Sequence, residues 1–316
     1  MYLITTNDKR KVMNKLLIIS KEKEKYLSLF ELSDLPDLEI CHDLRKANII
    51  LADTPLIFGL LDQFKSVEWI QSTFAGIDAL IKPSLRQNYS LTNVKGIFGQ
   101  QISEYVLGYC IQYFRHFSLY AKQQKQKQWV PHHYSSLTDK VMVILGTGSI
   151  GCYLANSAKA LGFIVHGINR SGIPPKESPF EKVFHISEIN EAFKQANVIV
   201  STLPNTEQTN ALLNANTLSD CNGGLLFNVG RGEVIDNLGL LQALENGSLS
   251  HAFLDVFINE PLSQECPYWH HPNITITPHI AALSFPEQVF EQFSENYLLW
   301  RDGFSLKNLV DFNKGY

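Results

Sequence analysis

The feature that most constrains the fold is an alternation of short apolar runs with segments of helical periodicity, which extends along most of the 316 residues. Short buried strands that alternate with amphipathic helices are typical of βα units, and such units build parallel sheets with helices on both faces. The alternation comes in two series separated by a helical stretch. Because a chain of this length exceeds what one hydrophobic core usually fills, we expect two α/β domains.

The positions of the apolar runs indicate how the two domains share the chain. The runs of the first series lie at 16–19, 49–52, 67–70 and 91–94, and those of the second at 141–145, 163–168, 198–201, 225–229, 252–256 and 274–277. Between the series, apolar and aromatic residues at steps of three and four predict one long helix: Ile102, Tyr105, Val106, Tyr109, Tyr113, Phe117 and Tyr120. A last helical pattern, at 287–300, is expected to return to the first domain. We therefore predict a doubly wound Rossmann domain (99–284) inserted into a second, discontinuous α/β domain (1–98 and 285–316).

A glycine-rich turn follows the first run of the second series. Gly146-Thr147-Gly148-Ser149-Ile150-Gly151 lies between that run and a helical segment that ends near Gly162. In a dinucleotide site the first glycine allows the tight turn, the second lets the backbone approach the pyrophosphate, and the third lets helix and strand pack closely. A plain glycine turn is the alternative, but this context favours nucleotide binding at a helix N-terminus. The predicted contacts are Gly146, Gly148, Ser149, Ile150 and Gly151.

The end of the next run predicts which nicotinamide cofactor is preferred. An NAD site usually places an Asp or Glu here to bind the 2′-hydroxyl of the adenosine ribose. This sequence has Asn169-Arg170-Ser171 instead, so no carboxylate repels a 2′-phosphate, and Arg170 and Ser171 both carry hydrogen-bond donors. We therefore expect NADPH to be preferred, with NADH possible; a surface arginine without this role is the alternative.

Composition and charge exclude several other classes of protein. The sequence is 45% hydrophobic and 18% charged, which is ordinary for a globular protein, and no apolar run is long enough for a membrane span. A net charge of −4 gives no general affinity for nucleic acid. Five scattered cysteines without CxxC spacing predict reduced thiols in the cytoplasm, and no metal site is expected. Met13 is a second plausible start, so residues 1–12 are expected to be dispensable.

Several further segments resemble the D-isomer-specific 2-hydroxyacid dehydrogenases, most closely their glyoxylate/hydroxypyruvate reductase A group. Beyond the glycine loop, the matching segments lie at 71–78, 103–106, 203–206, 228–232, 254–262 and 277–282. The resemblance covers almost all of the chain after the first apolar run. It implies a discontinuous, flavodoxin-like substrate domain with the cofactor domain between its parts, and reduction of small 2-keto acids.

Reduction of a 2-keto acid needs a cation for the carboxylate, a proton donor for the carbonyl oxygen, and a hydride donor. Arg231 and His279 each follow the end of an apolar run, which places them at the carboxyl edge of the predicted sheet, where ligands of this fold bind. The planar guanidinium of Arg231 suits a carboxylate, and His279 suits proton transfer near neutral pH. Glu260 is expected to orient the imidazole of His279 and to favour its protonated form. Each residue alone would more often be structural, but their placement at successive strand ends favours a catalytic set.

The resemblance implies further contacts. The amides of Ala75, Gly76 and Ile77 are expected to bind the substrate carboxylate, with a simple turn as the alternative. The expected cofactor contacts comprise Leu203, Pro204, Thr209, Val229, Gly230, Asp255, His279, Ala281 and Ala282, in addition to Asn169, Arg170 and Ser171. Leu51, Phe74 and Trp129 are candidates for the pocket border, and the segment around Trp129 is expected to approach a partner subunit in a homodimer.

Two alternatives remain open at this point. One is a dehydrogenase of the same fold that acts on a larger, branched or aromatic 2-keto acid, because few side chains decide substrate size. The other is a nucleotide-sensing corepressor or scaffold, because relatives with that role keep the fold and the catalytic residues. No tail or recognition motif in the sequence favours the second.

Overall fold

The computed structural model describes residues 13–312 and divides the chain into two compact units. The first unit extends to Lys95 and resumes at Ser284, and the second is formed by Gly96–Leu283. The sequence had placed the two crossings after residues 98 and 284. Residues 1–12, which we expect to be dispensable, lie outside the described part of the chain.

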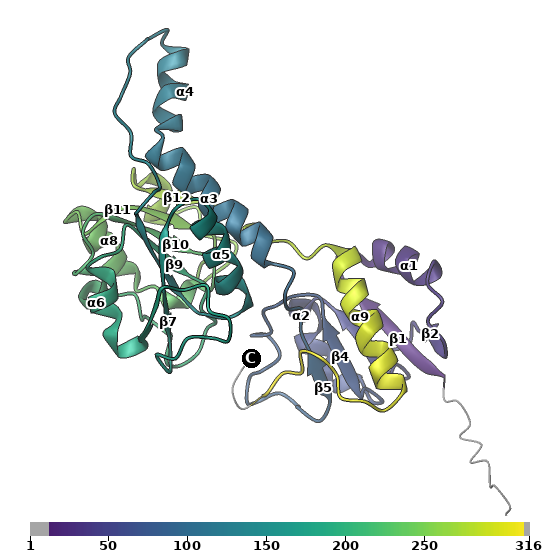
Figure 1. Cartoon of the computed structure of the whole chain (residues 1–316). Coiled ribbons are helices and arrows are strands. Elements are labelled where there is room, and N and C mark those ends of the chain that lie inside the picture. Colours follow the sequence, from purple (N-terminus) through teal and green to yellow (C-terminus); the bar gives the residue numbers. More distant parts are fainter. Residues whose placement is uncertain (1–12, 313–316) are drawn as a thin grey trace, which may run out of the picture. The chain divides into compact units, whose positions relative to one another are not determined.

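The first unit is a parallel sheet of five strands in the order β2-β1-β3-β4-β5, which is the flavodoxin-like order (Figure 1). Its strands are β1 (Asn14–Ile19), β2 (Leu38–Ile40), β3 (Ile49–Ala52), β4 (Trp69–Ser72) and β5 (Ser90–Thr92). Its helices are α1 (Lys23–Glu31), α2 (Thr54–Ile57), the 3-10 helix η1 (Phe58–Gln63) and α9 (Pro286–Arg301). The sequence missed β2, because this three-residue edge strand carries a central Glu39 and is only partly buried.

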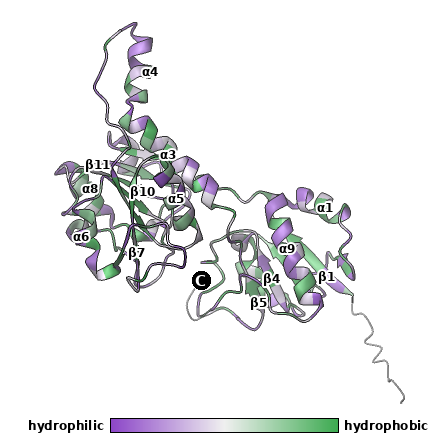
Figure 2. Cartoon of the chain, in the orientation of Figure 1, coloured by the Kyte–Doolittle hydropathy of each residue, from purple (hydrophilic) through white to green (hydrophobic). Residues whose placement is uncertain are grey.

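Helix α9 explains why the first unit needs the C-terminal part of the chain. The ring of Phe293 on α9 stacks on Trp69 of β4, with centroids 5.1 Å apart, and meets Phe30 of α1 edge-on. The indole Nε1 of Trp69 also donates to the hydroxyl of Thr92 at 2.8 Å. The helix shows hydrophobic and hydrophilic colours around its axis (Figure 2), and its exposed side carries Glu287, Glu291 and Glu295. The return of the chain therefore completes this core.

The second unit is a parallel sheet of seven strands in the order β12-β11-β10-β9-β6-β7-β8. Without β12 this is the doubly wound dinucleotide-binding order, so the predicted fold class is confirmed. The strands are β6 (Val141–Leu145), β7 (Ile164–Asn169), β8 (Lys182–His185), β9 (Val198–Ser201), β10 (Gly224–Asn228), β11 (Leu249–Leu254) and β12 (Ile274–Ile276). The helices are α3 (Gly99–Phe114), α4 (Phe117–Lys125), α5 (Ser149–Ala160), α6 (Ile189–Phe193), α7 (Ala215–Leu218) and α8 (Asn237–Glu245). Short 3-10 helices are η2 (Ile186–Glu188), η3 (Gly232–Val234) and η4 (Pro267–His270).

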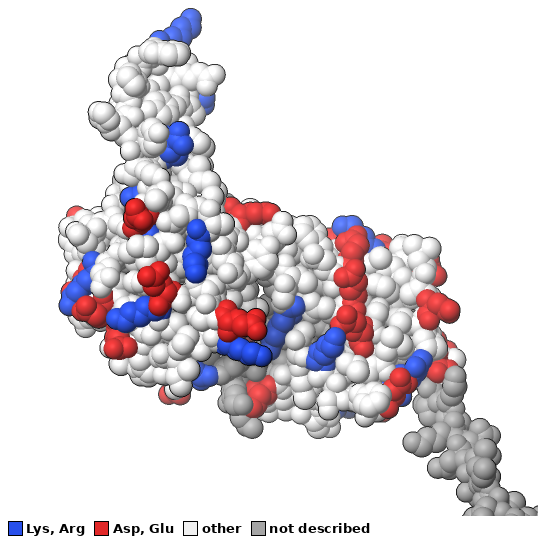
Figure 3. Space-filling model, in the orientation of Figure 1, with Lys and Arg blue, Asp and Glu red and all other residues white. Residues whose placement is uncertain are grey.

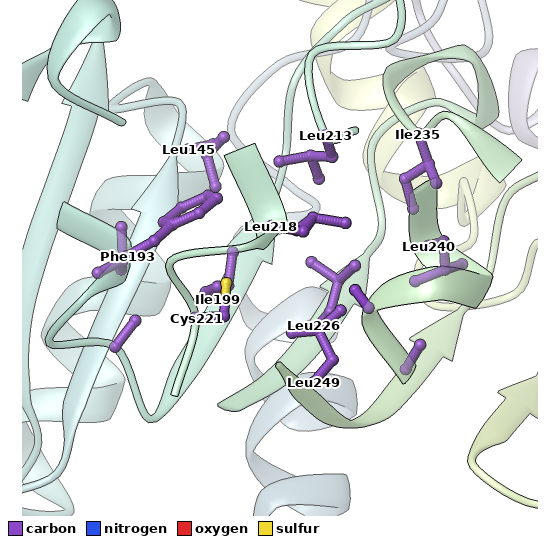
Figure 4. Packing of buried hydrophobic residues seen from close by; sticks show 14 of the residues in the cluster. Leu145, Phe193, Ile199, Leu213, Leu218, Cys221, Leu226, Ile235, Leu240 and Leu249 are labelled. Atoms are coloured by element: carbon purple, nitrogen blue, oxygen red, sulfur yellow. The ribbon is translucent and has the colours of Figure 1, made fainter. Parts of the chain in front are cut away.

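Apolar side chains cover both faces of this sheet. On one face, residues from β6, β9, β10 and the flanking helices pack together, as the close view of Leu145, Phe193, Ile199 and Leu226 shows (Figure 4). On the other face, α3 and α5 pack against the same strands. The edge strand β8 was not predicted, because Lys182 and His185 at its two ends leave only two apolar residues between them. The central strands therefore hold the glycine loop and the candidate catalytic residues on a rigid base.

The prediction of one long helix between the two series is wrong. The chain forms α3 and α4 separately, because His116 adopts a left-handed conformation (φ 56°) that ends the first helix. Helix α4 projects from the second unit (Figure 1), and the segment after it folds back, where the amide of His132 donates to the hydroxyl of Tyr120 at 3.0 Å. Trp129, in this projecting arm (residues 117–136), is 97% exposed.

Several further properties of residues 13–312 bear on function. Among them, no helix has the length and apolar character that crossing a bilayer requires, and no group of three or more His, Cys, Asp or Glu side chains is arranged to hold a metal ion. All five cysteines carry free thiols. Acidic and basic side chains are mixed on the face that Figure 3 shows, so no basic expanse is visible there.

Candidate active site

The glycine loop joins β6 to the N-terminus of α5 and has the shape that a diphosphate requires. Gly146 has φ 101°, a conformation that favours glycine, and a Cβ on Gly151 would collide with the carbonyl oxygen of Gly146. At Gly148, by contrast, a Cβ would meet nothing within 4 Å, so this side of the loop is open. The first amides of α5 have no partner within the helix and are available to an anion. The residues present therefore fit the diphosphate of a nicotinamide dinucleotide.

Two neighbouring strand ends close around this loop. A Cβ on Gly146 would lie 2.6 Å from the hydroxyl oxygen of Thr202, which follows β9, and a Cβ on Gly230, after β10, would strike the backbone of Leu203. Leu203 and Gly230 are thus brought together with the glycine loop by close backbone packing. Thr209 stabilises the turn at residues 204–209, because its hydroxyl donates to the carbonyl oxygen of Pro204 at 2.6 Å. The structure places Val229, half-buried, directly after β10.

Asn169, at the end of β7, organises the loop expected to contact the ribose. Its Nδ2 donates to the hydroxyl of Thr147 at 2.9 Å and to the carbonyl oxygen of Ile173 at 2.8 Å. Its Oδ1 accepts from the amides of Ser171 and Gly172, and from the Ser171 hydroxyl at 3.1 Å. The hydrogen-bonding groups of Asn169 are therefore engaged within the protein, and the proton of the Ser171 hydroxyl points to Asn169. Arg170 is exposed.

His279 and Glu260 form a direct pair. The Nδ1 of His279 lies 2.7 Å from Oε2 of Glu260, and the other carboxylate oxygen, Oε1, accepts from the amide of Phe257 at 2.9 Å. Both carboxylate oxygens are thus held, which fixes the plane in which the imidazole lies. The side chains keep 48% and 34% of their exposure, so the pair is open to a ligand.

A buried carboxylate holds the backbone beneath His279, a role that sequence reasoning missed although it named Asp255 as an expected cofactor contact. Asp255 is 2% exposed. Its Oδ1 accepts from the Thr277 hydroxyl at 2.6 Å and from the amide of Ile280 at 2.9 Å, and its Oδ2 accepts from the amide of Ala281 at 2.9 Å. The amide of His279 itself donates to the carbonyl oxygen of Asp255 at 2.9 Å. The turn that carries His279 is therefore built around Asp255.

Arg231 follows β10, which lies beside β11, and β11 in turn lies beside β12. The sheet order β12-β11-β10 therefore places the three predicted catalytic residues after three adjacent strands. The backbone of Arg231 is held by Asn228, whose Nδ2 donates to its carbonyl oxygen at 2.9 Å, and its Nη1 donates to the carbonyl oxygen of Gly230. A Cβ on Gly232 would collide with the backbone of Phe257, so the Arg231 segment packs directly on the loop that holds Glu260.

In the first unit, the loop at residues 75–77 presents backbone amides. Asn93 donates through Nδ2 to the carbonyl oxygen of Ala75 at 2.8 Å, and the amide of Val94 donates to the carbonyl oxygen of Phe74 at 3.2 Å. Within residues 13–312, the amides of Ala75, Gly76 and Ile77 have no acceptor. With two of the carbonyls tied back and three amides without an acceptor, the loop has the character of an anion-binding nest.

Leu51 and Phe74, two of the candidates for the pocket border, differ in how deeply the structure buries them. Leu51 is 0% exposed in the middle of the sheet of the first unit, so it does not border a pocket of that unit. It faces the core because all four residues of β3 are buried, as in a central strand of a parallel sheet. Phe74 is half-buried beside the amide loop.

A doubly wound sheet with a fitted glycine loop, together with a His–Glu pair and an arginine at adjacent strand ends, defines a nicotinamide-dependent oxidoreductase. Comparison with known proteins gives the family. Residues 107–281 match the NAD binding domain of the D-isomer specific 2-hydroxyacid dehydrogenase family. The chain belongs to the D-isomer-specific 2-hydroxyacid dehydrogenases, as the sequence motifs had predicted.

Individual relatives agree with this assignment. Glyoxylate/hydroxypyruvate reductase A of Serratia proteamaculans (strain 568) is 36% identical over 253 residues, which is 77% of this chain and 79% of the relative. A D-isomer specific 2-hydroxyacid dehydrogenase family protein from Aeromonas salmonicida has a solved structure that is 40% identical, with a TM-score of 0.90 over 95% of this chain and 99% of that one. A D-isomer specific 2-hydroxyacid dehydrogenase from Xanthobacter autotrophicus Py2, solved in complex with NADPH and MES, is 25% identical with a TM-score of 0.86, over 96% of this chain and 100% of that one. The chain is thus an NAD(P)-dependent enzyme that acts on small 2-hydroxy or 2-keto acids.

Proposed function

We propose that this enzyme reduces 2-keto acids of the glyoxylate and hydroxypyruvate type to D-2-hydroxy acids, with NADPH as the preferred cofactor. The observation that carries the proposal is the 2.7 Å contact between His279 Nδ1 and Glu260 Oε2, which supports a proton-donor role for this imidazole at the carboxyl edge of the second sheet. The names of similar relatives, including the reductase of Serratia proteamaculans, support the substrate class.

Each residue of the site has a defined task in this proposal. Glu260 holds Nδ1 of His279, which leaves Nε2 to give its proton to the carbonyl oxygen of the substrate. In the second unit Arg231 is suited to bind a carboxylate, and in the first unit the amides of Ala75, Gly76 and Ile77 are donors that suit a carboxylate. The bound nicotinamide supplies the hydride. The first unit is then the substrate domain and the second the cofactor domain.

The preference for NADPH rests on the loop after β7. No acidic side chain occupies residues 169–171, and the turn that Asn169 organises presents the exposed Arg170 beside it. A charge-assisted hydrogen bond to a 2′-phosphate contributes about 1.5–3 kcal/mol, which is roughly a tenfold to hundredfold preference. Arg170→Ala should therefore raise KM for NADPH far more than KM for NADH. Equal changes for the two cofactors would contradict the proposal.

The substrate is tested by following the loss of NADPH absorbance with glyoxylate, hydroxypyruvate, pyruvate and phenylpyruvate in separate assays. We expect the highest kcat/KM with glyoxylate or hydroxypyruvate. A higher value with phenylpyruvate would instead assign the enzyme to larger 2-keto acids. Tight NADPH binding without turnover of any acid would favour a nucleotide sensor.

We also infer a homodimer and a cytoplasmic location. The support for the dimer is the projecting arm, on which Trp129 is 97%, Tyr134 59% and Val130 49% exposed. Apolar side chains that stand this far from their own core usually mark an interface. Sedimentation equilibrium tests the inference: the chain should have twice its monomer mass, and a monomer at micromolar concentration would refute it. The free thiols agree with a reducing compartment.

A further inference from the structure

A hydrogen-bond chain links α3 to the turn beneath His279. The hydroxyl of Tyr105, on α3, lies 2.7 Å from the hydroxyl oxygen of Thr277, 172 residues further along the chain. Thr277 in turn lies 2.6 Å from Oδ1 of Asp255. An ionised carboxylate only accepts, so the single proton of Thr277 goes to Asp255, and Tyr105 must donate to Thr277. The direction of the chain is therefore fixed, from Tyr105 through Thr277 to Asp255.

The end of this chain supports a strained turn. His279 has φ 54°, a left-handed conformation that is costly for a residue with a side chain. Asp255 stabilises it, because its side chain accepts from the amides of Ile280 and Ala281 and its carbonyl oxygen accepts from the amide of His279. Since Thr277 shares Oδ1 of Asp255 with Ile280, a change in the Thr277 hydroxyl alters the hydrogen bonds of the turn.

Tyr105 itself is held firmly and stays a donor. Its ring meets Tyr109 edge-on, with centroids 4.9 Å apart, and Tyr109 packs on Phe253 of β11. Burial, with a smaller contribution from the charge of Asp255, raises the pKa of Tyr105 well above its ordinary value. The hydroxyl therefore remains protonated at neutral pH.

We propose that Tyr105 is a positioning residue for His279, which acts through the Thr277 hydroxyl and Asp255 to fix the turn that presents the imidazole to Glu260. This inference deepens the proposed function, because it rests on His279 as the proton donor. It assigns a role to the segment 103–106, which the family motifs single out but which supplies no group to the His–Glu pair.

The experiment compares Tyr105→Phe with Tyr109→Phe. Tyr105→Phe keeps the ring and removes the hydroxyl that meets Thr277. Tyr109→Phe is the matched control, since it removes a hydroxyl one turn along the same helix, from a ring that packs beside Tyr105. Thr277→Val removes the middle of the chain, and Thr277→Ser keeps its hydroxyl. For each variant we measure kcat and KM over a range of pH, the Kd of NADPH, and the hydrogen exchange of the amides of Ile280 and Ala281 by NMR.

For Tyr105→Phe and Thr277→Val we expect kcat to fall about 10-fold while the KM of the keto acid and the Kd of NADPH stay within about 2-fold. The pH at which kcat is half-maximal should move down, because a less ordered turn weakens the contact of the imidazolium with Glu260. Amide exchange at residues 280 and 281 should accelerate. Thr277→Ser and Tyr109→Phe should match the unmodified enzyme, and Tyr105→Phe should add little in the Thr277→Val background, because both act through one chain.

Equal behaviour of Tyr105→Phe and Tyr109→Phe would overturn the proposal, as would independent effects of Tyr105→Phe and Thr277→Val. If Thr277→Val does not fold, the comparison of Tyr105→Phe with Tyr109→Phe and Thr277→Ser still decides. The exchange measurement needs no turnover, so the positioning role is tested even if every 2-keto acid fails as a substrate. A failure of the proposed function and a failure of this inference are therefore distinguishable.

Discussion

Glu260→Gln tests the electrostatic and geometric role of the carboxylate at once. In the structure Oε2 of Glu260 meets His279 Nδ1 at 2.7 Å while Oε1 accepts from the Phe257 amide at 2.9 Å. Glutamine keeps the shape but has one acceptor and one donor. If the amide oxygen of the introduced glutamine faces His279, its NH₂ group faces the amide of Phe257. If the oxygen faces the amide of Phe257 instead, the NH₂ group faces Nδ1 of His279. Either arrangement loses one hydrogen bond and the negative charge.

The magnitude follows from these contacts. A hydrogen bond to a charged group contributes about 1.5–3 kcal/mol, which is roughly tenfold to 150-fold in rate. Because His279 keeps 48% and Glu260 34% of its side-chain exposure, solvent screening favours the lower end, so we expect kcat at neutral pH to fall about 10-fold.

The assay is steady-state reduction of the best keto acid by NADPH from pH 5 to 9, with Glu265→Gln as the control. Glu265 is an exposed carboxylate on the same connection between β11 and β12, and its amide, not its side chain, makes the local contact with Ser263. The control should behave as the unmodified enzyme. A Glu260→Gln variant with unchanged kcat and an unchanged pH profile would refute the role assigned to the carboxylate.

Two further predictions concern other parts of the chain. Asn93→Ala frees the carbonyl oxygen of Ala75, so the amide loop should lose its orientation. In steady-state kinetics KM for the keto acid should rise about 10-fold, with little change in kcat or in the Kd of NADPH. A fall in kcat alone would contradict this prediction. Burial, with a contribution from His271, lowers the pKa of His251 from 6.5 to about 4, so the neutral ring stabilises the fold fully above pH 6.5 and this contribution is lost as pH falls toward 4. After allowance for partial exposure, this contribution is about 1–2 kcal/mol. In urea titrations, His251→Gln should make the free energy of unfolding less dependent on pH between 6.5 and 4. An unchanged pH dependence would show that other groups govern acid stability.

The parts of the fold that were predictable are those where one hydrophobic period dominates. Central strands such as β6 and β10 are buried on both faces and are read as continuous apolar runs. The edge strands β2 and β8 were missed because one side of an edge strand meets solvent and carries polar residues such as Glu39 and Lys182. The break between α3 and α4 was missed because it depends on the backbone conformation of His116, which the apolar spacing does not report.

The candidate site shows the same division between chain order and three-dimensional contact. The order of the strands and the residues that follow them were sufficient to predict that Glu260 and His279 form a pair. The role of Asp255 could not be predicted in this way, because it depends on amides at 280 and 281 that any residue would supply, and on a tyrosine hydroxyl from a distant helix. Asn169 was expected to face the cofactor because its position at the end of a predicted strand follows from the apolar runs. Its five local hydrogen bonds could not be predicted, because they depend on how the loop folds.

The central claim, that His279 gives the proton to a keto acid reduced by NADPH, is tested most directly by single-turnover oxidation of bound NADPH in His279→Gln. The account predicts an NADPH Kd within about 3-fold of the unmodified enzyme and hydride transfer slower by at least about 100-fold, together with slower reduction by the unmodified enzyme as pH rises. Hydride transfer in His279→Gln within about 3-fold of the unmodified rate, at saturating keto acid, would contradict it.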